Sequence, residues 1–161
     1  MPIRVPDNLP ALRALHAESV DIIPQKQAVR QDIRPLRLLL LNLMPKKRDT
    51  EIQFARLFGN TPLQVEMILM TTASYTPQNT EPGYLRRFYR QLDDVRDDYF
   101  DALIITGAPI ETLPFEDVKY WGELTEIMEW SREHCFRRLG ICWGAQALLW
   151  HFHKVQKHGL K

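Results

Sequence analysis

The sequence has few cysteines, almost no net charge and no long apolar run. Only two cysteines occur among 161 residues, Cys135 and Cys142, and their spacing builds neither a disulfide framework nor a zinc site. The formal net charge of +1 gives no electrostatic reason for binding nucleic acid or a membrane surface. No apolar run approaches the length of a membrane span, and the first residues lack the pattern of a signal peptide. We therefore expect a cytoplasmic protein with no metal site and with neither nucleic acid nor membrane as a partner.

What the sequence does contain is the composition of one globular domain. Hydrophobic residues make up 45% of the chain and charged residues 25%. A chain of 161 residues is long enough to bury a core and too short for two comfortable domains. Five prolines break residues 1–35 into short pieces, which predicts an extended N-terminal arm with one helix near residues 10–17. Residues 36–161 are predicted to form the N-terminal part of an α/β domain.

Four apolar segments have the length and composition of strands. Residues 36–43 are almost uninterrupted leucine, which is typical of a strand buried on both faces of a parallel sheet. The other segments are residues 63–69, residues 100–106 and the residues that lead into Gly140. Strand and helix patterns alternate four times along the chain. This order predicts an α/β fold with a right-handed, doubly wound and mainly parallel sheet.

The expected helices are defined by apolar spacing and by their end signals. One helix is expected to begin at Thr50, because Thr50 and Gln53 fit a capping box, and to end at Gly59-Asn60, which supplies a stop signal. Residues 117–135 have an apolar side that would cover the sheet, and residues 143–152 form an apolar helix. One more segment has apolar residues at helical spacing: Leu85, Phe88, Tyr89 and Leu92.

The most informative motif is Gly-x-Cys-x-Gly, placed between a short apolar strand and an apolar helix. Gly140 and Gly144 remove the side chains that would clash in a sharp strand-to-helix turn, and this turn exposes Cys142 in a strained conformation. The positive end of the following helix favours the thiolate, which is the attacking species. The backbone N–H of Trp143 would point at a developing oxyanion. The alternative is a buried cysteine between two packing glycines, but the flanking strand and helix favour a nucleophile.

Three loops are expected to share the carboxyl edge of this sheet, where ligands of such folds bind. They are the strand-to-helix turn at Cys142, called the elbow below, the loop that carries Lys46 and Lys47, and the turn Gly107-Ala108-Pro109. Lysines facing the thiol could stabilise an oxyanion, hold the phosphates of a large cofactor or only solvate a turn. The Gly-Ala-Pro turn could equally do no more than end a strand. The spacing alone leaves these alternatives open.

No histidine in the sequence is a good candidate for the base that a cysteine nucleophile usually needs. His151 and His153 lie roughly 12 Å or more along the helix that leaves the elbow, at about 1.5 Å per residue. His134 precedes the elbow strand at the far end of the sheet, while His16 lies in the arm and His158 in the tail. The sequence therefore predicts a nucleophile whose base is absent from this chain.

Six segments spread over the whole chain resemble the homoserine O-acyltransferases of methionine biosynthesis. They begin at Met1, Ile33, Leu41, Thr61, Thr106 and Cys142, and they read Met-Pro-Ile-Arg-Val-Pro, Ile-Arg-Pro-Leu, Leu-Asn-Leu-Met-Pro-Lys-Lys, Thr-Pro-Leu-Gln-Val, Thr-Gly-Ala-Pro and Cys-Trp-Gly-Ala-Gln-Ala. The resemblance implies a class I glutamine amidotransferase-like, flavodoxin-like fold that this chain contains in truncated form. It also implies ping-pong acyl transfer, in which a cysteine takes an acyl group from coenzyme A and passes it to the γ-hydroxyl of L-homoserine.

The resemblance also implies roles for particular residues and molecules. Cys142 would be the acyl-thioester nucleophile, and Lys47 and the amide of Trp143 would stabilise the oxyanion. Lys46 and Gly107-Ala108-Pro109 would belong to the substrate loops. The family's enzymes continue for roughly as many residues again, and that second half should supply the base histidine and its glutamate partner. Acyl-CoA and L-homoserine would be the partners, with no permanently bound cofactor and with a homodimer left open.

Glu111 occupies the position that, in the family, helps to choose the acyl donor. Small or apolar residues there accompany succinyl-CoA, and glutamate accompanies acetyl-CoA. A second carboxylate, as in a succinyl group, about 4 Å away costs roughly 4 kcal/mol at an effective dielectric constant of about 20. Acetyl-CoA is therefore the expected donor and succinyl-CoA the alternative. Glu111 could also be no more than a surface carboxylate at the start of a loop.

Two other functions stay open. Glutamine amide hydrolysis uses the same elbow, although the Lys46-Lys47 loop and the full-length resemblance count against it. A truncated relative without catalysis would bind coenzyme A, or a partner chain through the open edge of the sheet. In the favoured interpretation the parent protein is a homoserine O-acetyltransferase, and the 161 residues alone are catalytically incomplete.

Overall fold

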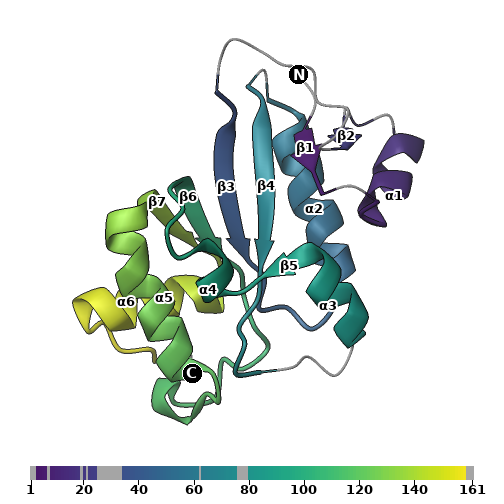
Figure 1. Ribbon diagram of the computed structural model, residues 1–161. Coiled ribbons are helices and arrows are strands. Elements are labelled where there is room, and N and C mark those ends of the chain that lie inside the picture. The colour runs from purple at the N-terminus through teal and green to yellow at the C-terminus, as the bar shows by residue number, and fades with distance from the viewer. Residues whose placement is uncertain are drawn as a thin grey trace.

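The computed structural model describes residues 3–6, 8–18, 20, 22–24, 34–61, 63–75 and 80–158. Within these residues seven strands form one sheet in the order β2-β1-β4-β3-β6-β7, with β5 paired to β4 (Figure 1). Every pairing among them is parallel. The doubly wound α/β fold predicted from the sequence is confirmed. The strands are β1 (Ile3–Val5), β2 (Ile22–Pro24), β3 (Leu36–Leu41), β4 (Val65–Met70), β5 (Tyr89–Arg90), β6 (Phe100–Ile105) and β7 (Cys135–Gly140).

Helices cover both faces of this sheet because its central strands are apolar on both sides. In β3, Leu40 packs in the cluster that includes Phe54 of α2, while Leu39 and Leu41 pack in the cluster that includes Met128 of α5. All three leucines are fully buried, as the leucine run predicts. The helices are α1 (Ala11–Ala17), α2 (Lys47–Gly59), α3 (Pro82–Phe88), α4 (Leu92–Val95), α5 (Trp121–His134) and α6 (Trp143–His153), with a 3₁₀ helix η2 (Phe115–Asp117).

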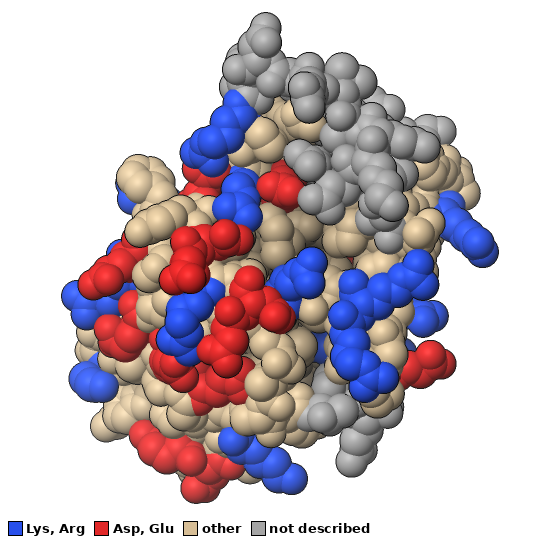
Figure 2. All heavy atoms as spheres, in the orientation of Figure 1, with Lys and Arg blue, Asp and Glu red and all other residues tan. Residues whose placement is uncertain are grey.

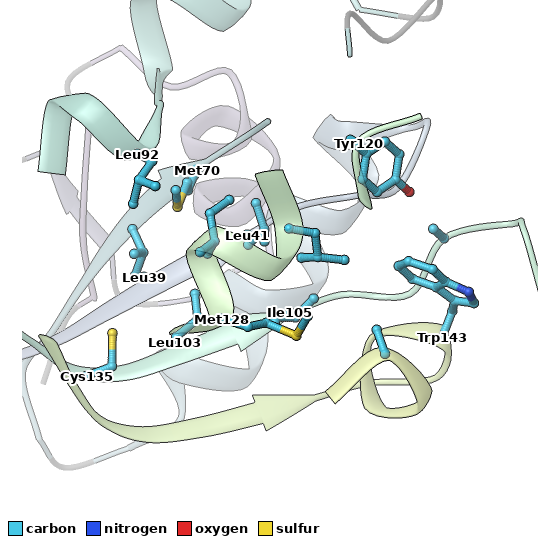
Figure 3. Close-up of a cluster of buried hydrophobic side chains, with 14 of the residues drawn as sticks. Leu39, Leu41, Met70, Leu92, Leu103, Ile105, Tyr120, Met128, Cys135 and Trp143 are labelled. Carbon is cyan, nitrogen blue, oxygen red and sulfur yellow. The ribbon is translucent and has the colours of Figure 1, made fainter. Parts of the chain in front are cut away.

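The larger of the two cores lies between the sheet and the layer of α5 and α6. The strand residues of this core mostly lie two positions apart, because successive side chains of a strand point to opposite faces of the sheet. Figure 3 shows how the core runs from one end of the sheet to the other, with Cys135 at one end, Trp143 at the other and a row of buried side chains between them, namely Leu39, Leu41, Leu103, Ile105 and Met128.

The structure corrects two of the expected helices. Thr50 is not a cap, since α2 already begins at Lys47 and the Thr50 hydroxyl donates to the Lys46 carbonyl (3.3 Å). The apolar spacing from Leu85 to Leu92 does not form one helix. The chain leaves α3 at Phe88, and Tyr89 and Arg90 pair in parallel with the end of β4 before α4 begins. Backbone pairing to the sheet edge therefore overrides a helical spacing of apolar residues.

The first 35 residues, predicted as an extended arm, contribute to the sheet where they are described. β1 pairs with β2 and with β4, and α1 lies within the expected range of residues 10–17. Residues 25–33, and with them the start of the segment Ile33-Arg-Pro-Leu, lie outside the described residues. The division of the chain into an arm and a domain stays a prediction.

The strand order places a topological switch point at the centre of the sheet. From β3 the chain passes through α2 to β4 on one side, and from β6 it passes through α5 to β7 on the other. The connections after β3 and β6 therefore leave in opposite directions, which opens a crevice beyond the carboxyl ends of these two strands. Ligands of doubly wound sheets bind in this crevice.

Strand β7 is one of the two edge strands of the sheet in the described residues. Phe136 is 73% exposed and Leu139 53% exposed, and Arg137 and Arg138 between them are exposed as well, so this edge carries both apolar and basic side chains. Charges of both signs are mixed over the face in Figure 2, with basic side chains gathered over α3, whose last turn carries Arg86 and Arg87. No helix of the described chain is long and apolar enough to cross a bilayer.

Candidate active site

The turn between β7 and α6 holds Cys142 in a backbone conformation that side chains rarely adopt. Its φ is 53° and its ψ is −120°, and its side chain is exposed. The turn is closed by hydrogen bonds from the Gly144 amide to the Ile141 carbonyl (3.0 Å) and from the Ala145 amide to the Cys142 carbonyl (3.0 Å). Cys142 is therefore the residue before the helix, with its thiol outside the core, as the Gly-x-Cys-x-Gly motif predicts.

Both glycines of the motif are required by close backbone contacts. A Cβ on Gly140 would lie 2.5 Å from the Ala145 amide nitrogen. A Cβ on Gly144 would lie 2.5 Å from the Ile105 carbonyl oxygen and 2.6 Å from that of Thr106. The start of α6 can approach the end of β6 only because Gly144 carries no side chain, and Gly140 leaves room for the first turn of α6 beside the end of β7. The sharp turn at Cys142 follows from that approach.

The side chain and the backbone amide of Trp143 have separate roles in this turn. Its side chain is fully buried among the rings of Phe115, Tyr120 and Trp121, at centroid distances of 6.0, 6.3 and 6.4 Å. Its backbone amide, the first of α6, donates no hydrogen bond to another described residue. The indole thus anchors the turn in the core, while the amide stays available at the N-terminus of the helix. The sequence motif predicted the role of the amide but not that of the indole.

The loop after β6 passes close to the thiol. A Cβ on Gly107 would lie 3.2 Å from the Cys142 Cβ and 3.6 Å from its Sγ. Thr106 ties this loop to the one after β3, because its Oγ1 accepts a hydrogen bond from the Leu43 amide (2.8 Å). The structure therefore brings the three predicted loops together at the carboxyl edge of the sheet.

The two neighbouring lysines have different environments. Lys46 is the exposed residue before α2, and Lys47 is the first residue of the helix and only 3% exposed. The Lys47 Nζ donates to the Asn42 carbonyl (2.5 Å) and lies 5.3 Å from the centre of the Tyr89 ring. Burial lowers the pKa of Lys47 to about 8, and the negative charge of Glu51 opposes that shift. Lys46 is therefore a solvated lysine of the turn, whereas Lys47 is buried.

Lys47 and the Gly-Ala-Pro turn line one cavity of about 320 Å³ at the switch point. Its wall is mostly apolar, with Leu43, Ile110 and Tyr120 among the lining residues. Ala108 and Pro109 belong to the wall, and Cys142 lies next to it across Gly107. A small acyl group with an apolar body and a polar carbonyl suits such a space.

Glu111 lies on the rim of this cavity and not in its wall. Its neighbours Ile110 and Leu113 line the cavity, while Glu111 itself is exposed. Lys157, beyond the end of α6, holds this loop: its Nζ donates to the Glu111 carbonyl (2.8 Å) and to the Leu113 carbonyl. No local pattern in the sequence pointed to Lys157, because the contact joins residues 46 positions apart.

None of the five histidines, all of which the structure describes, lines the cavity. The His151 Nε2 lies 2.6 Å from Glu129 Oε1, on the outer surface of α5 and α6. His134 stacks between Trp130 and Tyr99, and its Nδ1 lies 3.0 Å from the Trp130 carbonyl. The described residues contain no cluster of three or more His, Cys, Asp or Glu side chains suited to a metal ion.

Comparison with known proteins gives a match over essentially the whole chain. Residues 2–161 match the sequence profile of the family described as homoserine O-succinyltransferase. This chain belongs to that family. It is 54% identical over 160 residues to the homoserine O-acetyltransferase of Novosphingobium aromaticivorans, and 56% identical over 160 residues to that of Synechococcus elongatus. These alignments cover 99% of this chain but 53% and 54% of the relatives, so the chain spans about half the length of the curated relatives it matches.

The glycine of the elbow gives the first prediction. Gly144→Ala should lower the free energy of unfolding by about 1–3 kcal/mol, since the new methyl group overlaps two backbone carbonyl oxygens that have no room to move. Urea unfolding should show a lower midpoint with an unchanged slope. Gly122→Ala in α5, where a Cβ meets nothing within 4 Å, is the matched control and should be neutral or stabilising. Equal stability of the two variants would contradict the close approach.

The two cysteines give the second prediction. Iodoacetamide at about pH 8 should alkylate the exposed Cys142 and leave Cys135 intact, because burial raises the pKa of the Cys135 thiol to about 12 and keeps it protonated. Mass spectrometry of proteolytic fragments gives the modified position. Cys142→Ser should abolish labelling of the folded protein, and denaturant should restore labelling at Cys135. Equal labelling of both thiols before unfolding would be the contrary result.

Proposed function

We propose that the protein containing this chain transfers an acyl group from acyl-coenzyme A to the hydroxyl of L-homoserine, through a thioester on Cys142. The reaction would serve methionine biosynthesis in the cytoplasm. The observation that carries the proposal is the strained turn at Cys142, found in a chain 54% identical to a homoserine O-acetyltransferase. The buried Lys47 and the cavity it lines support the same chemistry.

In the first half-reaction, the Cys142 thiolate attacks the carbonyl carbon of the acyl-CoA thioester. The oxyanion that forms would be stabilised by the amide of Trp143, which is free of other partners in the described chain, and by the Lys47 ammonium. Collapse of the tetrahedral intermediate breaks the bond to coenzyme A, which leaves as its thiolate. The acyl group is then held as a thioester on Cys142.

In the second half-reaction, the homoserine hydroxyl attacks this thioester and a base takes its proton. No described histidine lines the cavity. The family resemblance assigns the base histidine and its glutamate partner to the second half of the enzymes' length, beyond the part that this chain matches. The present chain would supply the nucleophile and the oxyanion site of the first half-reaction.

We further propose acetyl-CoA as the donor. Glu111 lies on the rim of the cavity, where the terminal carboxylate of a succinyl group would meet a second negative charge. The relatives named above carry the name homoserine O-acetyltransferase, whereas the family profile carries the name homoserine O-succinyltransferase. These two names differ in the acyl group, and the Glu111 carboxylate on the rim would supply a physical basis for a choice between the two donors.

The third prediction concerns the first half-reaction. Mixing the chain with acetyl-CoA should add one acetyl group to Cys142, detected by intact-mass and fragment mass spectrometry. Lys47→Met, which keeps most of the buried stem and removes the charge, should slow the acylation about 10²–10³-fold. Cys142→Ser should abolish the adduct, and Cys135→Ser should keep it.

The absence of any Cys142 adduct with acetyl-CoA or succinyl-CoA in a folded protein would refute the acyl-transfer proposal. Release of ammonia from glutamine would instead favour amide hydrolysis at the same elbow.

The fourth prediction concerns donor choice. In a competition between the two donors, Glu111→Gly should raise the ratio of succinyl to acetyl adducts about tenfold to a hundredfold, because it removes the repelling charge and opens space on the rim. Glu116→Gln is the matched control, since Glu116 belongs to the next turn of the same connection and accepts a hydrogen bond from the Trp150 Nε1 (3.2 Å). A ratio that Glu111→Gly leaves unchanged would show that Glu111 does not select the donor.

A further inference from the structure

A cluster of buried polar side chains surrounds Lys47, and two of its members, Asn42 and Lys47, also line the cavity. Its members come from the end of β3, from α2, from α3 and from β5. Burying so many polar groups is unfavourable unless each finds a partner. The members, all buried, are Asn42, Lys47, Glu51, Tyr84 and Tyr89.

The backbone fixes the direction of the hydrogen bonds in this cluster. Asn42 Oδ1 accepts from the Met44 amide (3.1 Å), so the Asn42 Nδ2 faces the other way and donates to the Tyr89 hydroxyl (2.9 Å). A hydroxyl that accepts this bond has its single proton left to donate. Tyr89 therefore donates to Glu51 Oε1 (2.6 Å).

Tyr84 holds the other oxygen of the same carboxyl group. Its hydroxyl donates to Glu51 Oε2 at 2.6 Å. Two donated O–H bonds stabilise the ionised carboxylate, while burial acts in the opposite direction and raises the pKa of Glu51. Glu51 is thus fixed at both oxygens by side chains from two other elements, which is unusual for a residue on a helix of the outer layer.

Glu51 lies four residues after Lys47 on α2, so the two side chains share one side of the helix. The titratable and charged groups packed around Lys47 and Glu51 are Arg48 on α2, Tyr89 on β5 and Tyr84 on α3, with Arg48 stacked on the Tyr84 ring at 4.6 Å. The wall of the cavity that Lys47 lines also contains Asp117, Lys119, Tyr75 and Tyr120. Glu51 is the acidic group whose charge acts on the pKa of Lys47. Its field favours the ammonium form of Lys47, against the desolvation that favours the neutral amine.

We propose that Glu51, clamped by Tyr84 and Tyr89, is a positioning residue whose negative charge keeps Lys47 an ammonium that faces the cavity. The inference rests on the proposed function, in which that ammonium stabilises the oxyanion. A neutral lysine would keep its place in the wall but could not offset the charge that develops on the carbonyl oxygen. Glu51 therefore acts through Lys47 and not by touching the substrate.

The fifth prediction is a direct titration of Lys47. The protein is labelled with ¹³C at the lysine ε carbons, and the Lys47 signal, assigned by its loss in Lys47→Arg, is followed by NMR from neutral to alkaline pH. Because lysine is charged below its pKa, removing the negative neighbour should lower the midpoint. We expect Glu51→Gln to lower it by about one pH unit or more. Asp49→Asn is the matched control, since Asp49 is an exposed acid in the first turn of the same helix, and it should leave the midpoint nearly unchanged.

An unchanged Lys47 midpoint in folded Glu51→Gln would overturn the proposal. Should that variant fail to fold, Tyr84→Phe removes one of the two hydroxyl donors, so Glu51 binds its proton more readily and the Lys47 midpoint again falls. An unchanged midpoint in folded Tyr84→Phe would contradict the clamp. Glu51→Asp, which keeps the charge, should restore most of the midpoint lost in Glu51→Gln.

The rate of Cys142 acylation gives a second readout. In the unsubstituted protein the rate should fall as pH rises through about 8, where Lys47 loses its proton, and in Glu51→Gln the fall should occur at lower pH. A merely structural Glu51 would lower the rate equally at every pH. The titration needs no acyl donor, so a chain that forms no acyl adduct but shows the shifted Lys47 midpoint would refute the proposed function and leave the charge relation intact.

Discussion

The approach of α6 to the end of β6 is the contact on which the candidate site depends. Gly144 lies so close to the carbonyl oxygens of Ile105 and Thr106 that no side chain fits between them. This contact leaves the chain room to enter the helix only through a positive φ at Cys142. A strained residue of this kind costs about 1–3 kcal/mol. The fully buried indole of Trp143, one residue later, anchors the turn by packing in the core, although its Nε1–H has no hydrogen-bond partner within the described residues.

A second constraint comes from placing a lysine at the switch point of a parallel sheet. The crevice between the ends of β3 and β6 is where a ligand fits, and a lysine buried in its wall loses hydration, which destabilises the charged form. Lys47 is tolerated because the Asn42 carbonyl accepts its hydrogen bond and because the sheet edge at β5 brings Tyr89 over it. The Cys142 thiol, by contrast, is exposed, at the residue that precedes α6.

The features that the sequence predicted are those determined by neighbours along the chain. The leucine run of β3, the alternation of strand and helix, and the turn at Cys142 each depend on local spacing and on the absence of side chains at two glycines. The features it missed depend on contacts between distant segments. Tyr89 belongs to a strand paired with β4, although the spacing of its apolar neighbours is helical. Lys157, beyond the end of α6, donates a hydrogen bond to the Glu111 loop. Glu51 was not singled out from the sequence although it stands four residues after Lys47, because its burial and its two hydrogen bonds depend on tyrosines from other elements.

The position of Glu111 bears on how a surface carboxylate selects a donor. An exposed charge is screened by water, so its effect falls well below that of the same pair inside the protein. Selectivity in the proposed reaction then requires that the carboxylate stay near the end of the acyl chain, since repulsion weakens as the separation grows. Lys157 fixes the loop through the backbone carbonyls on both sides of this turn and leaves the Glu111 side chain free to face the donor. Donor choice would thus depend on the segment after α6 as well as on the carboxylate itself.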